Sequence, residues 1–325
     1  MPKKARATGF VVGIALTAAL IISGCQAVKT DDAASPSSAV PPAVAPQEVL
    51  QAVAAAATQK TLPTSIDNAA LLAASGDDTS EWAVPDCTPA LEASSLDDIE
   101  PCILGDTGSE NTMILIGDSG AAMWHGALDL VGKRTGWKVI ALTKNNCGPA
   151  ALTYYQWQLE RDFTECDAWQ EWRLGVIKEQ QAKIVVMAGW YGGNLGPNRA
   201  ETPAVWRDGL VKSAQQLPAG TKVFILGNQP HPEQAPAECV ADNPDDLTAC
   251  ALPAATVIPD QTGWSQAAAQ VGATYIDVDP WFCTEVCPAV IADQIVYAGK
   301  YHITKDYGEY LSGSIESIMQ PELAS

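Results

Sequence analysis

The chain has 325 residues, of which 38 are acidic and 19 are basic, so its net charge is −19. An acidic surface repels phosphate backbones and anionic lipid headgroups, which argues against nucleic acid as a partner. The substrate is therefore expected to be neutral or to be recognised through short-range contacts.

The first 24 residues have the features of a secretory signal peptide. A short basic segment precedes an apolar stretch over residues 9–22, which is too short to remain as a transmembrane helix. The stretch ends in Ser23-Gly24-Cys25, which resembles the lipobox of bacterial lipoproteins. Cleavage there leaves a lipid on Cys25 and attaches the protein to the outer face of the cytoplasmic membrane, in the cell envelope. The alternative is an ordinary secretory signal with a cysteine placed there by chance.

Residues 25–64 are predicted to form a spacer between the membrane and the folded domain. The segment is rich in Ala, Pro and Ser, and its repeated prolines argue against a packed core. Residues 47–59 are rich in alanine, which favours one short helix. The remaining residues, 65–325, are numerous enough for one α/β domain with a large core.

Apolar runs alternate with helical patterns along residues 65–325. The apolar runs predict strands over residues 113–117, 138–143, 184–188, 222–227 and 274–278. Helical patterns cover residues 121–135, 167–181, 203–217, 261–271 and 305–319. This alternation predicts a parallel five-stranded sheet with helices on both faces, in which ligands bind beyond the carboxyl ends of the strands.

Gly117-Asp118-Ser119 follows the first predicted strand and precedes the first helix. A serine at this turn lies near backbone N–H groups that have no partner within the helix, and such groups can stabilise the oxyanion formed when a serine attacks an ester. Ser119 is therefore a candidate nucleophile, and Asp118 is expected to brace the turn. The alternative is an ordinary helix cap, because Asp and Ser are both good N-cap residues.

A serine nucleophile needs a base, which is usually histidine. The chain has three histidines. His302 precedes the last helical segment, from which an α/β sheet can return it to the first strand, so it is the candidate base. A surface hydrogen bond at a helix entry is the alternative role for His302. His125, in the first helix, is expected to be structural, and His231 lies between two prolines in a rigid loop.

Eight cysteines follow Cys25, and their even number in an exported chain indicates four disulfides. Sequence alone allows many pairings. Local pairing is the simplest, and it predicts the bonds Cys87–Cys102, Cys147–Cys166, Cys239–Cys250 and Cys283–Cys287. Zinc is the competing interpretation, but the chain has no Cys-x-x-Cys pair and no histidine cluster. No metal or other cofactor is predicted.

Several motifs resemble those of SGNH (GDSL-like) hydrolases. The resemblance is greatest to the extracellular SGNH domain fused to family 3 membrane acyltransferases, which O-acetylate envelope polysaccharides. It extends from about Cys87 to Met319 in family order, and rests on residues 115–119, 142–149, 166–169, 185–190, 277–283 and 297–304. This chain carries no membrane acyltransferase domain, and the lipid anchor is expected to replace it.

The resemblance implies a three-layer α/β/α sandwich of the flavodoxin-like type. It implies Ser119 as the nucleophile and His302 as the general base. Oxyanion donors are expected at the Ser119 N–H, in the segment that holds Asn146 and Gly148, and in residues 189–194.

Some of these residues have a second interpretation. Asn194 is either the oxyanion asparagine or a residue of a glycine-rich turn, and Gly148 is either a donor or a turn glycine beside Pro149. Trp190 and Tyr191 lie at the carboxyl end of a strand, where they can stack on a sugar ring; packing is their alternative role.

The sequence departs from the family pattern at two positions. Many relatives have an Asp three residues before the histidine, where this chain has Gly299. A backbone carbonyl, Asp293 or Asp306 is the expected replacement that orients His302. Relatives often have a bulky residue after the serine, and Gly120 is expected to open space beside the nucleophile. Loss of activity is the other interpretation of both changes.

Two functions follow from these residues. The first is an envelope-tethered serine esterase or O-acyltransferase that acts on O-acyl groups of a cell-envelope glycan or glycolipid through an acyl-serine intermediate. A membrane acyltransferase is a further candidate partner. The second is a non-catalytic binding or scaffold lipoprotein that keeps the SGNH fold.

Overall fold

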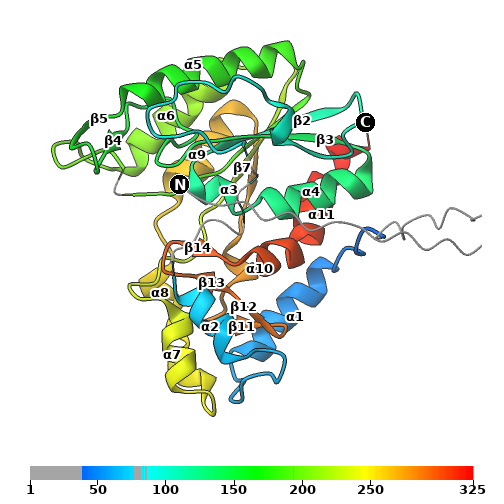
Figure 1. The fold of residues 1–325 in the computed structure, drawn as a ribbon, viewed down its shortest axis with the longest axis vertical. Coiled ribbons are helices and arrows are strands. Elements are labelled where there is room, and N and C mark those ends of the chain that lie inside the picture. Colours follow the sequence, from blue (N-terminus) through cyan, green and yellow to red (C-terminus); the bar gives the residue numbers. More distant parts are fainter. Residues whose placement is uncertain (1–38, 77–81, 83, 85, 193, 325) are drawn as a thin grey trace, which may run out of the picture. The chain divides into compact units, whose positions relative to one another are not determined.

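A six-stranded sheet lies at the centre of the structure, with the strand order β1-β3-β2-β6-β7-β9 (Figure 1). Five of its strands are parallel and match the predicted ones: β2 (Thr112–Gly117), β3 (Lys138–Thr143), β6 (Ile184–Met187), β7 (Lys222–Leu226) and β9 (Thr274–Ile276). The sixth strand, β1 (Ile103–Gly105), pairs antiparallel with β3 at one edge. Its three half-buried residues give no alternating pattern, so the sequence does not reveal it.

The computed structural model describes residues 39–76, 82, 84, 86–192 and 194–324. The predicted signal peptide and Cys25 lie outside these residues. From Val40 onward the chain belongs to one folded unit. Within the described ranges, none of the helices has both the length and the apolar character needed to cross a membrane.

Helices cover both faces of the sheet, as the sequence predicts. Every residue of β2 is buried, and successive side chains point to opposite faces, so Leu115 joins one core and Ile116 the other. The first core is covered by α1 (Pro46–Ala56), α4 (His125–Thr135), α10 (Lys305–Tyr310) and α11 (Ser312–Leu323). The second is covered by α5 (Thr164–Glu179), α6 (Pro203–Gln215) and α9 (Thr262–Val271).

Two predicted helices are each divided in the structure. Residues 121–135 form α3 (Ser119–Ala122) and α4, and residues 305–319 form α10 and the start of α11. The first division occurs at Met123 and Trp124, which are both buried in the same core as Leu115. Buried apolar residues therefore continue across the break between α3 and α4, and hydrophobic periodicity alone does not show where the first helix ends.

The folded unit begins earlier than predicted. Residues 46–56 form α1, and Val49 and Val53 on this helix are fully buried in the same core as Leu115. The boundary at residue 64 between spacer and domain is therefore wrong, because burial of these valines makes the alanine-rich helix part of the core. Pro46 occupies the first turn of α1, where proline is tolerated.

Short elements form a third hydrophobic cluster beyond the carboxyl side of the sheet (Figure 1). The helices α2 (Asn68–Ser75) and α7 (Pro236–Asp242) contribute to it. Small two-residue strands form ribbons in the connecting loops, namely β4 (Tyr155–Gln156), β5 (Arg161–Asp162), β8 (Leu252–Pro253), β10 (Val286–Cys287), β11 (Val290–Ile291), β12 (Gln294–Ile295), β13 (Tyr297–Ala298) and β14 (His302–Ile303). The remaining helical turns are η1 (Glu100–Cys102), η2 (Leu247–Cys250), α8 (Ala254–Val257) and η3 (Asp279–Trp281).

Four disulfides join neighbouring cysteines, and they are the four pairs expected from local spacing: Cys87–Cys102, Cys147–Cys166, Cys239–Cys250 and Cys283–Cys287. Each bond closes a short segment between core elements. This distribution is typical of a protein that folds in an oxidising compartment.

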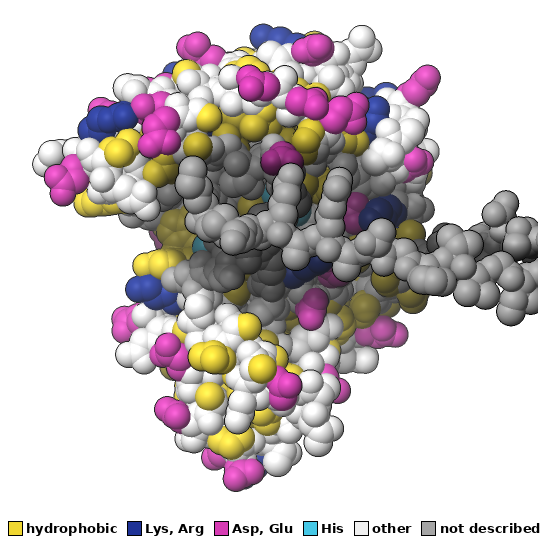
Figure 2. Space-filling model, in the orientation of Figure 1, with side chains coloured by type: hydrophobic (Ala, Val, Ile, Leu, Met, Phe, Trp, Pro, Cys, Tyr) yellow, Lys and Arg dark blue, Asp and Glu magenta, His cyan; other side chains and the backbone are white. Residues whose placement is uncertain are grey.

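Acidic side chains are spread over the face of the molecule shown in Figure 2, and basic ones are fewer. This distribution agrees with the negative charge of the sequence.

Candidate active site

A cavity of about 580 Å³ lies beyond the carboxyl ends of the central strands. Ser119 lines it from the turn after β2, and His302 lines it from β14, close to the C-terminus. The two candidate catalytic residues therefore face one cavity. Asp118 and Tyr301 line it beside these two residues. Its other walls come from the segments after β3 and β6 and from the β4–β5 hairpin, namely Asn145, Asn146, Trp157, Gln158, Trp190, Gly192 and Asn194. The carboxyl ends of parallel strands meet at one edge, which is why these distant segments converge.

Asp118 fixes the turn that carries Ser119. It is the N-cap residue of α3, and its Oδ1 accepts a hydrogen bond from the Gly120 N–H at 2.9 Å. The Trp190 N–H donates to the same oxygen at 2.9 Å and to Oδ2 at 3.2 Å. Burial raises the pKa of Asp118 to about 7, although these hydrogen bonds and the positive charge of Arg173 act in the opposite direction.

Two glycines allow the loop after β6 to approach this turn. Gly117 has φ of +153°, and a Cβ there would lie 1.8 Å from the carbonyl oxygen of Ala188. A Cβ on Gly120 would lie 2.8 Å from the Trp190 nitrogen. The expectation that Gly120 opens space beside the nucleophile is therefore wrong, because backbone atoms of the neighbouring loop occupy that space.

His302 is 7% exposed, and its ring packs against an aromatic side chain from a distant segment. The centroids of the His302 and Trp82 rings lie 4.9 Å apart, with a tilt of 45°. His302 pairs with Ala298 across the β13–β14 ribbon, and Thr304 caps the helix that follows. The ribbon and the cap together fix the direction from which the imidazole enters the cavity.

Glycine occupies the position at which many relatives have the aspartate. Gly299 lies in the turn of the β13–β14 ribbon with φ of +58°, a conformation that glycine adopts without strain. Its N–H donates a hydrogen bond to the Ala74 carbonyl at 2.7 Å. Asp86 and Asp293 adopt similar positive φ values in this chain, so the backbone conformation by itself does not exclude an aspartate at this position.

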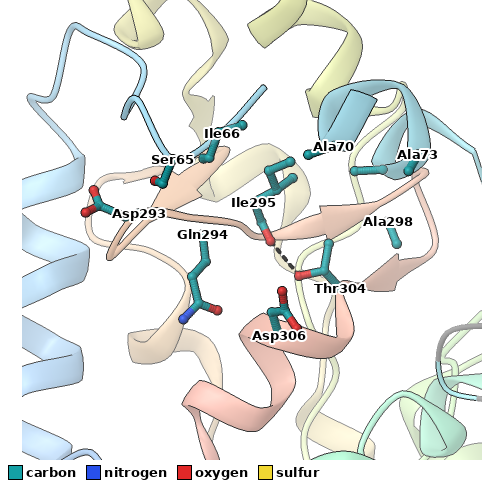
Figure 3. A pocket seen from close by; sticks show the side chains of 11 residues that line it. Ser65, Ile66, Ala70, Ala73, Asp293, Gln294, Ile295, Ala298, Thr304 and Asp306 are labelled. Carbon is teal, nitrogen blue, oxygen red and sulfur yellow. Dashed lines mark hydrogen bonds between the residues drawn. The ribbon is translucent and has the colours of Figure 1, made fainter. Parts of the chain in front are cut away.

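Asp293 and Asp306 line a different cavity from His302 (Figure 3). This second cavity has a volume of about 350 Å³ and lies against α2 and the β11–β12 ribbon. Within it the Thr304 hydroxyl donates to the carbonyl of Ile295 at 2.5 Å. The prediction that one of these two carboxylates replaces the family aspartate is not supported by their placement.

The family model described as "SGNH domain (fused to AT3 domains)" matches residues 86–317. The chain belongs to the SGNH domain family. This confirms the resemblance seen in the sequence, and the ordered motifs fall within the matched residues.

A solved structure supports the same fold for this SGNH domain. It is the periplasmic domain of a lipopolysaccharide acetyltransferase from Salmonella ser. Paratyphi A. The TM-score is 0.55 at 16% sequence identity, and the match covers 74% of this chain and 92% of that chain. No curated protein sequence matches the chain.

The expected oxyanion groups of the SGNH domain are divided between the cavity and the wall behind it. Asn146, in a left-handed conformation with φ of 62°, and Asn194 both line the cavity. Gly148 is buried and does not line the cavity. Its carbonyl oxygen accepts a hydrogen bond from Arg173 at 3.0 Å, and a Cβ at this position would lie 2.5 Å from the Tyr154 hydroxyl oxygen. Gly148 therefore allows close packing.

The segment predicted to supply oxyanion donors includes Asn145, but the sequence did not single out the side chains of Trp157, Gln158 and Tyr301 as cavity residues. Trp157 and Gln158 lie on a two-strand hairpin, and Tyr301 precedes His302. No sequence pattern indicates these residues, because their exposure and their place beside the cavity are set by the fold.

The other two histidines have structural surroundings. His125 is buried, with Nδ1 3.0 Å from the Trp82 carbonyl oxygen and Nε2 3.2 Å from the Thr143 hydroxyl. His231 stacks on Trp190 with ring centroids 3.6 Å apart. Burial lowers the pKa of each imidazole to about 4, so both remain neutral near pH 7.

Proposed function

We propose that this SGNH domain is a serine esterase or O-acyltransferase that acts on O-acyl groups of a cell-envelope glycan or glycolipid. The observation that carries the proposal is the single cavity lined by Ser119, His302 and a group of side-chain amides. A nucleophile, a base and hydrogen-bond donors are the parts that acyl transfer requires.

The first half of the reaction forms an acyl-serine. The Ser119 hydroxyl oxygen attacks the ester carbonyl carbon while the His302 imidazole accepts the hydroxyl proton. The carbonyl oxygen becomes an oxyanion, and collapse of this intermediate breaks the bond to the alcohol oxygen. The imidazolium returns its proton to the departing alcohol.

The oxyanion needs donors that are not engaged elsewhere. The Gly120 and Trp190 N–H groups both donate to Asp118. We therefore assign the oxyanion donors to the Ser119 N–H and to the side-chain amides of Asn146 and Asn194, which line the same cavity.

The second half of the reaction releases the acyl group. His302 takes a proton from a water molecule or from a sugar hydroxyl, whose oxygen attacks the acyl carbon. The bond from the acyl carbon to the Ser119 oxygen then breaks, and the imidazolium returns its proton to that oxygen. Water yields a free carboxylic acid, and a sugar hydroxyl yields a new ester. The same residues therefore perform hydrolysis or transfer, depending on which acceptor occupies the cavity.

The proposed location is the outer face of the cytoplasmic membrane. The signal-like segment and the motif before Cys25 support a lipid anchor, and the four disulfides agree with an oxidising compartment. The acceptor is a glycan by analogy with the lipopolysaccharide acetyltransferase named above. A membrane acyltransferase that delivers the acyl group is the proposed partner.

Labelling with a fluorophosphonate probe and turnover of a chromogenic acetyl ester test the proposal. Wild-type protein is expected to form a covalent adduct and release acetate, whereas Ser119→Ala and His302→Gln lose both. Ser265→Ala is a matched control, because this hydroxyl bonds within α9 to the Thr262 carbonyl. If wild type is as inert as Ser119→Ala, the protein is a binding or scaffold lipoprotein.

A further inference from the structure

The cavity is lined mainly by aromatic rings and amides. Asp118, His302 and Tyr301 are its titratable members, and the Lys300 ammonium lies 4.9 Å from the centre of the Tyr301 ring. The rings are those of Trp157, Trp190 and Tyr301, and the amides are those of Asn145, Asn146, Gln158 and Asn194. Aromatic faces pack against apolar C–H surfaces, and amides both donate to and accept from hydroxyls. Together these groups match an uncharged ligand rich in hydroxyl groups.

Trp190 is already packed within the protein. One face of its ring stacks on His231 at 3.6 Å with an angle of 11°, and Tyr301 meets it edge-on at 5.3 Å. Tyr191, the neighbouring aromatic residue, packs on Trp206 at 5.6 Å and does not line the cavity. Trp190 therefore lines the cavity, as the sequence predicts, with one ring face taken by His231, whereas Tyr191 lies outside the lining.

Trp157 lines the cavity, and its ring packs at 4.9 Å against Tyr155 in an edge-on arrangement. It lies in the turn of the β4–β5 hairpin and is 50% exposed, and Tyr301 across the cavity lining is 41% exposed. Large aromatic side chains gain free energy from burial, so exposing two of them around one cavity is unfavourable for an isolated domain. A bound ring that covers them removes this unfavourable exposure.

The hairpin that carries Trp157 is joined to its surroundings by a disulfide, a hydrogen bond and two ion pairs. The Cys147–Cys166 disulfide closes the segment, and the Tyr155 N–H donates to the Asn194 carbonyl at 2.8 Å. Two ion pairs hold its second strand, since Arg161 contacts Glu165 at 2.7 Å and Arg199 contacts Asp162 at 2.6 Å. A preorganised ring loses little conformational entropy when it binds a ligand.

We propose that Trp157 forms a subsite for a neutral pyranose ring, with Tyr301 as the second aromatic wall. The sugar packs its C–H face on the Trp157 indole, and its hydroxyls bond to the amides of Asn145 and Gln158. The subsite deepens the proposed function, on which it rests for the reaction at Ser119, and it selects the glycan whose acyl group reaches that serine.

Binding of a panel of neutral oligosaccharides tests the subsite without any need for turnover. The panel contains glucose, galactose, mannose, arabinose and N-acetylhexosamine oligomers, and binding is measured by calorimetry on the full chain carrying Ser119→Ala. Trp157→Ala is expected to weaken the best binder by about ten-fold or more, since truncated aromatic anchors cost at least that much affinity. Trp157→Phe should recover most of the affinity.

Leu159→Ala is the matched control, because Leu159 is 37% exposed on the same turn but does not line the cavity. It should bind like the parent protein. The subsite is overturned if no member of the panel binds, if an oligosaccharide of uronic acids binds better than every neutral one, or if the Trp157→Ala and Leu159→Ala proteins bind equally. Failure of the proposed function is seen separately, as an absence of fluorophosphonate labelling at Ser119 in otherwise wild-type protein.

Discussion

The Trp190 N–H donates a hydrogen bond to the buried carboxylate of Asp118 at 2.9 Å. This contact joins the turn that carries Ser119 to the loop after β6, and both segments line the cavity. The same carboxylate accepts from the Gly120 N–H. Asp118 thus acts on the proposed nucleophile through the backbone.

Replacing Asp118 should change how stability depends on pH. Burial raises its pKa from the ordinary 3.8 to about 7, so the folded protein holds this proton more tightly than the unfolded chain. The contribution to stability is then complete below about pH 4 and is lost as pH rises through about 7. Urea unfolding of wild type and Asp118→Asn between these pH values should show that the free energy of unfolding falls less with rising pH in the variant. Parallel plots of this free energy against pH would contradict a raised pKa for Asp118.

His231 should produce the opposite dependence. Burial lowers its pKa from 6.5 to about 4, so the unfolded chain takes up the proton first and stability is lost as pH falls through about 4. His231→Phe keeps a ring against Trp190 and cannot ionise. Thermal unfolding at pH 7 and near pH 4.5 should show a smaller acid-induced loss of stability for this variant than for wild type. An equal loss of stability in the two proteins would contradict the lowered pKa of His231.

A methyl group on Gly120 should damage the site. Its Cβ would meet the Trp190 nitrogen at 2.8 Å and the Gly189 carbonyl carbon at 2.9 Å, and both are backbone atoms that move only with the loop. Gly120→Ala should cost about 1–3 kcal/mol of stability, as overpacking does, and lower esterase turnover.

Gly175→Ala is the matched control for Gly120→Ala. Gly175 lies in α5, and a Cβ there has no atom within 4 Å. Gly175→Ala should raise the free energy of unfolding by about 0.5–1 kcal/mol, because alanine is the better helix former. If the two substitutions changed the free energy of unfolding equally, the close approach of the Trp190 backbone to Gly120 would not be the cause of the destabilisation.

Removing the Cys147–Cys166 disulfide should affect glycan binding as well as stability. The double variant to serine loses about 2–4 kcal/mol of unfolding free energy. It also frees the segment that carries Trp157, so oligosaccharide affinity should fall. The double variant at Cys239–Cys250, a bond in the α7 region, should lose stability and keep its affinity. Calorimetry on both proteins compares them, and equal affinities would oppose a role for the hairpin.

Trp82 should position the proposed base. Its ring packs against His302 at 4.9 Å, and its carbonyl oxygen contacts His125. Trp82→Ala should lower kcat for the acetyl ester and shift the pH at which activity appears, because the imidazole loses the surface that orients it. Trp82→Phe should restore the wild-type pH profile. A variant that is destabilised but has an unaltered profile would reduce Trp82 to a packing role.

The strands and the site edge follow from local sequence. The fully apolar run before Gly117 produces a strand buried on both faces, and the alternation with helices makes the sheet parallel. A parallel sheet places the residues after its strands at one edge, so Ser119 could be assigned to the cavity end from sequence alone. Proximity of paired cysteines along the chain likewise indicated the four disulfides.

Packing between distant segments decided the remaining features. Burial of Val49 extended the domain into the expected spacer, and the approach of the Trp190 backbone filled the space beside Gly120. His231 stacks on one face of the Trp190 ring, whereas the Trp157 side chain stays half exposed. Periodicity depends on neighbours within a few residues, whereas these contacts join segments far apart in the chain, so only the folded structure determines them.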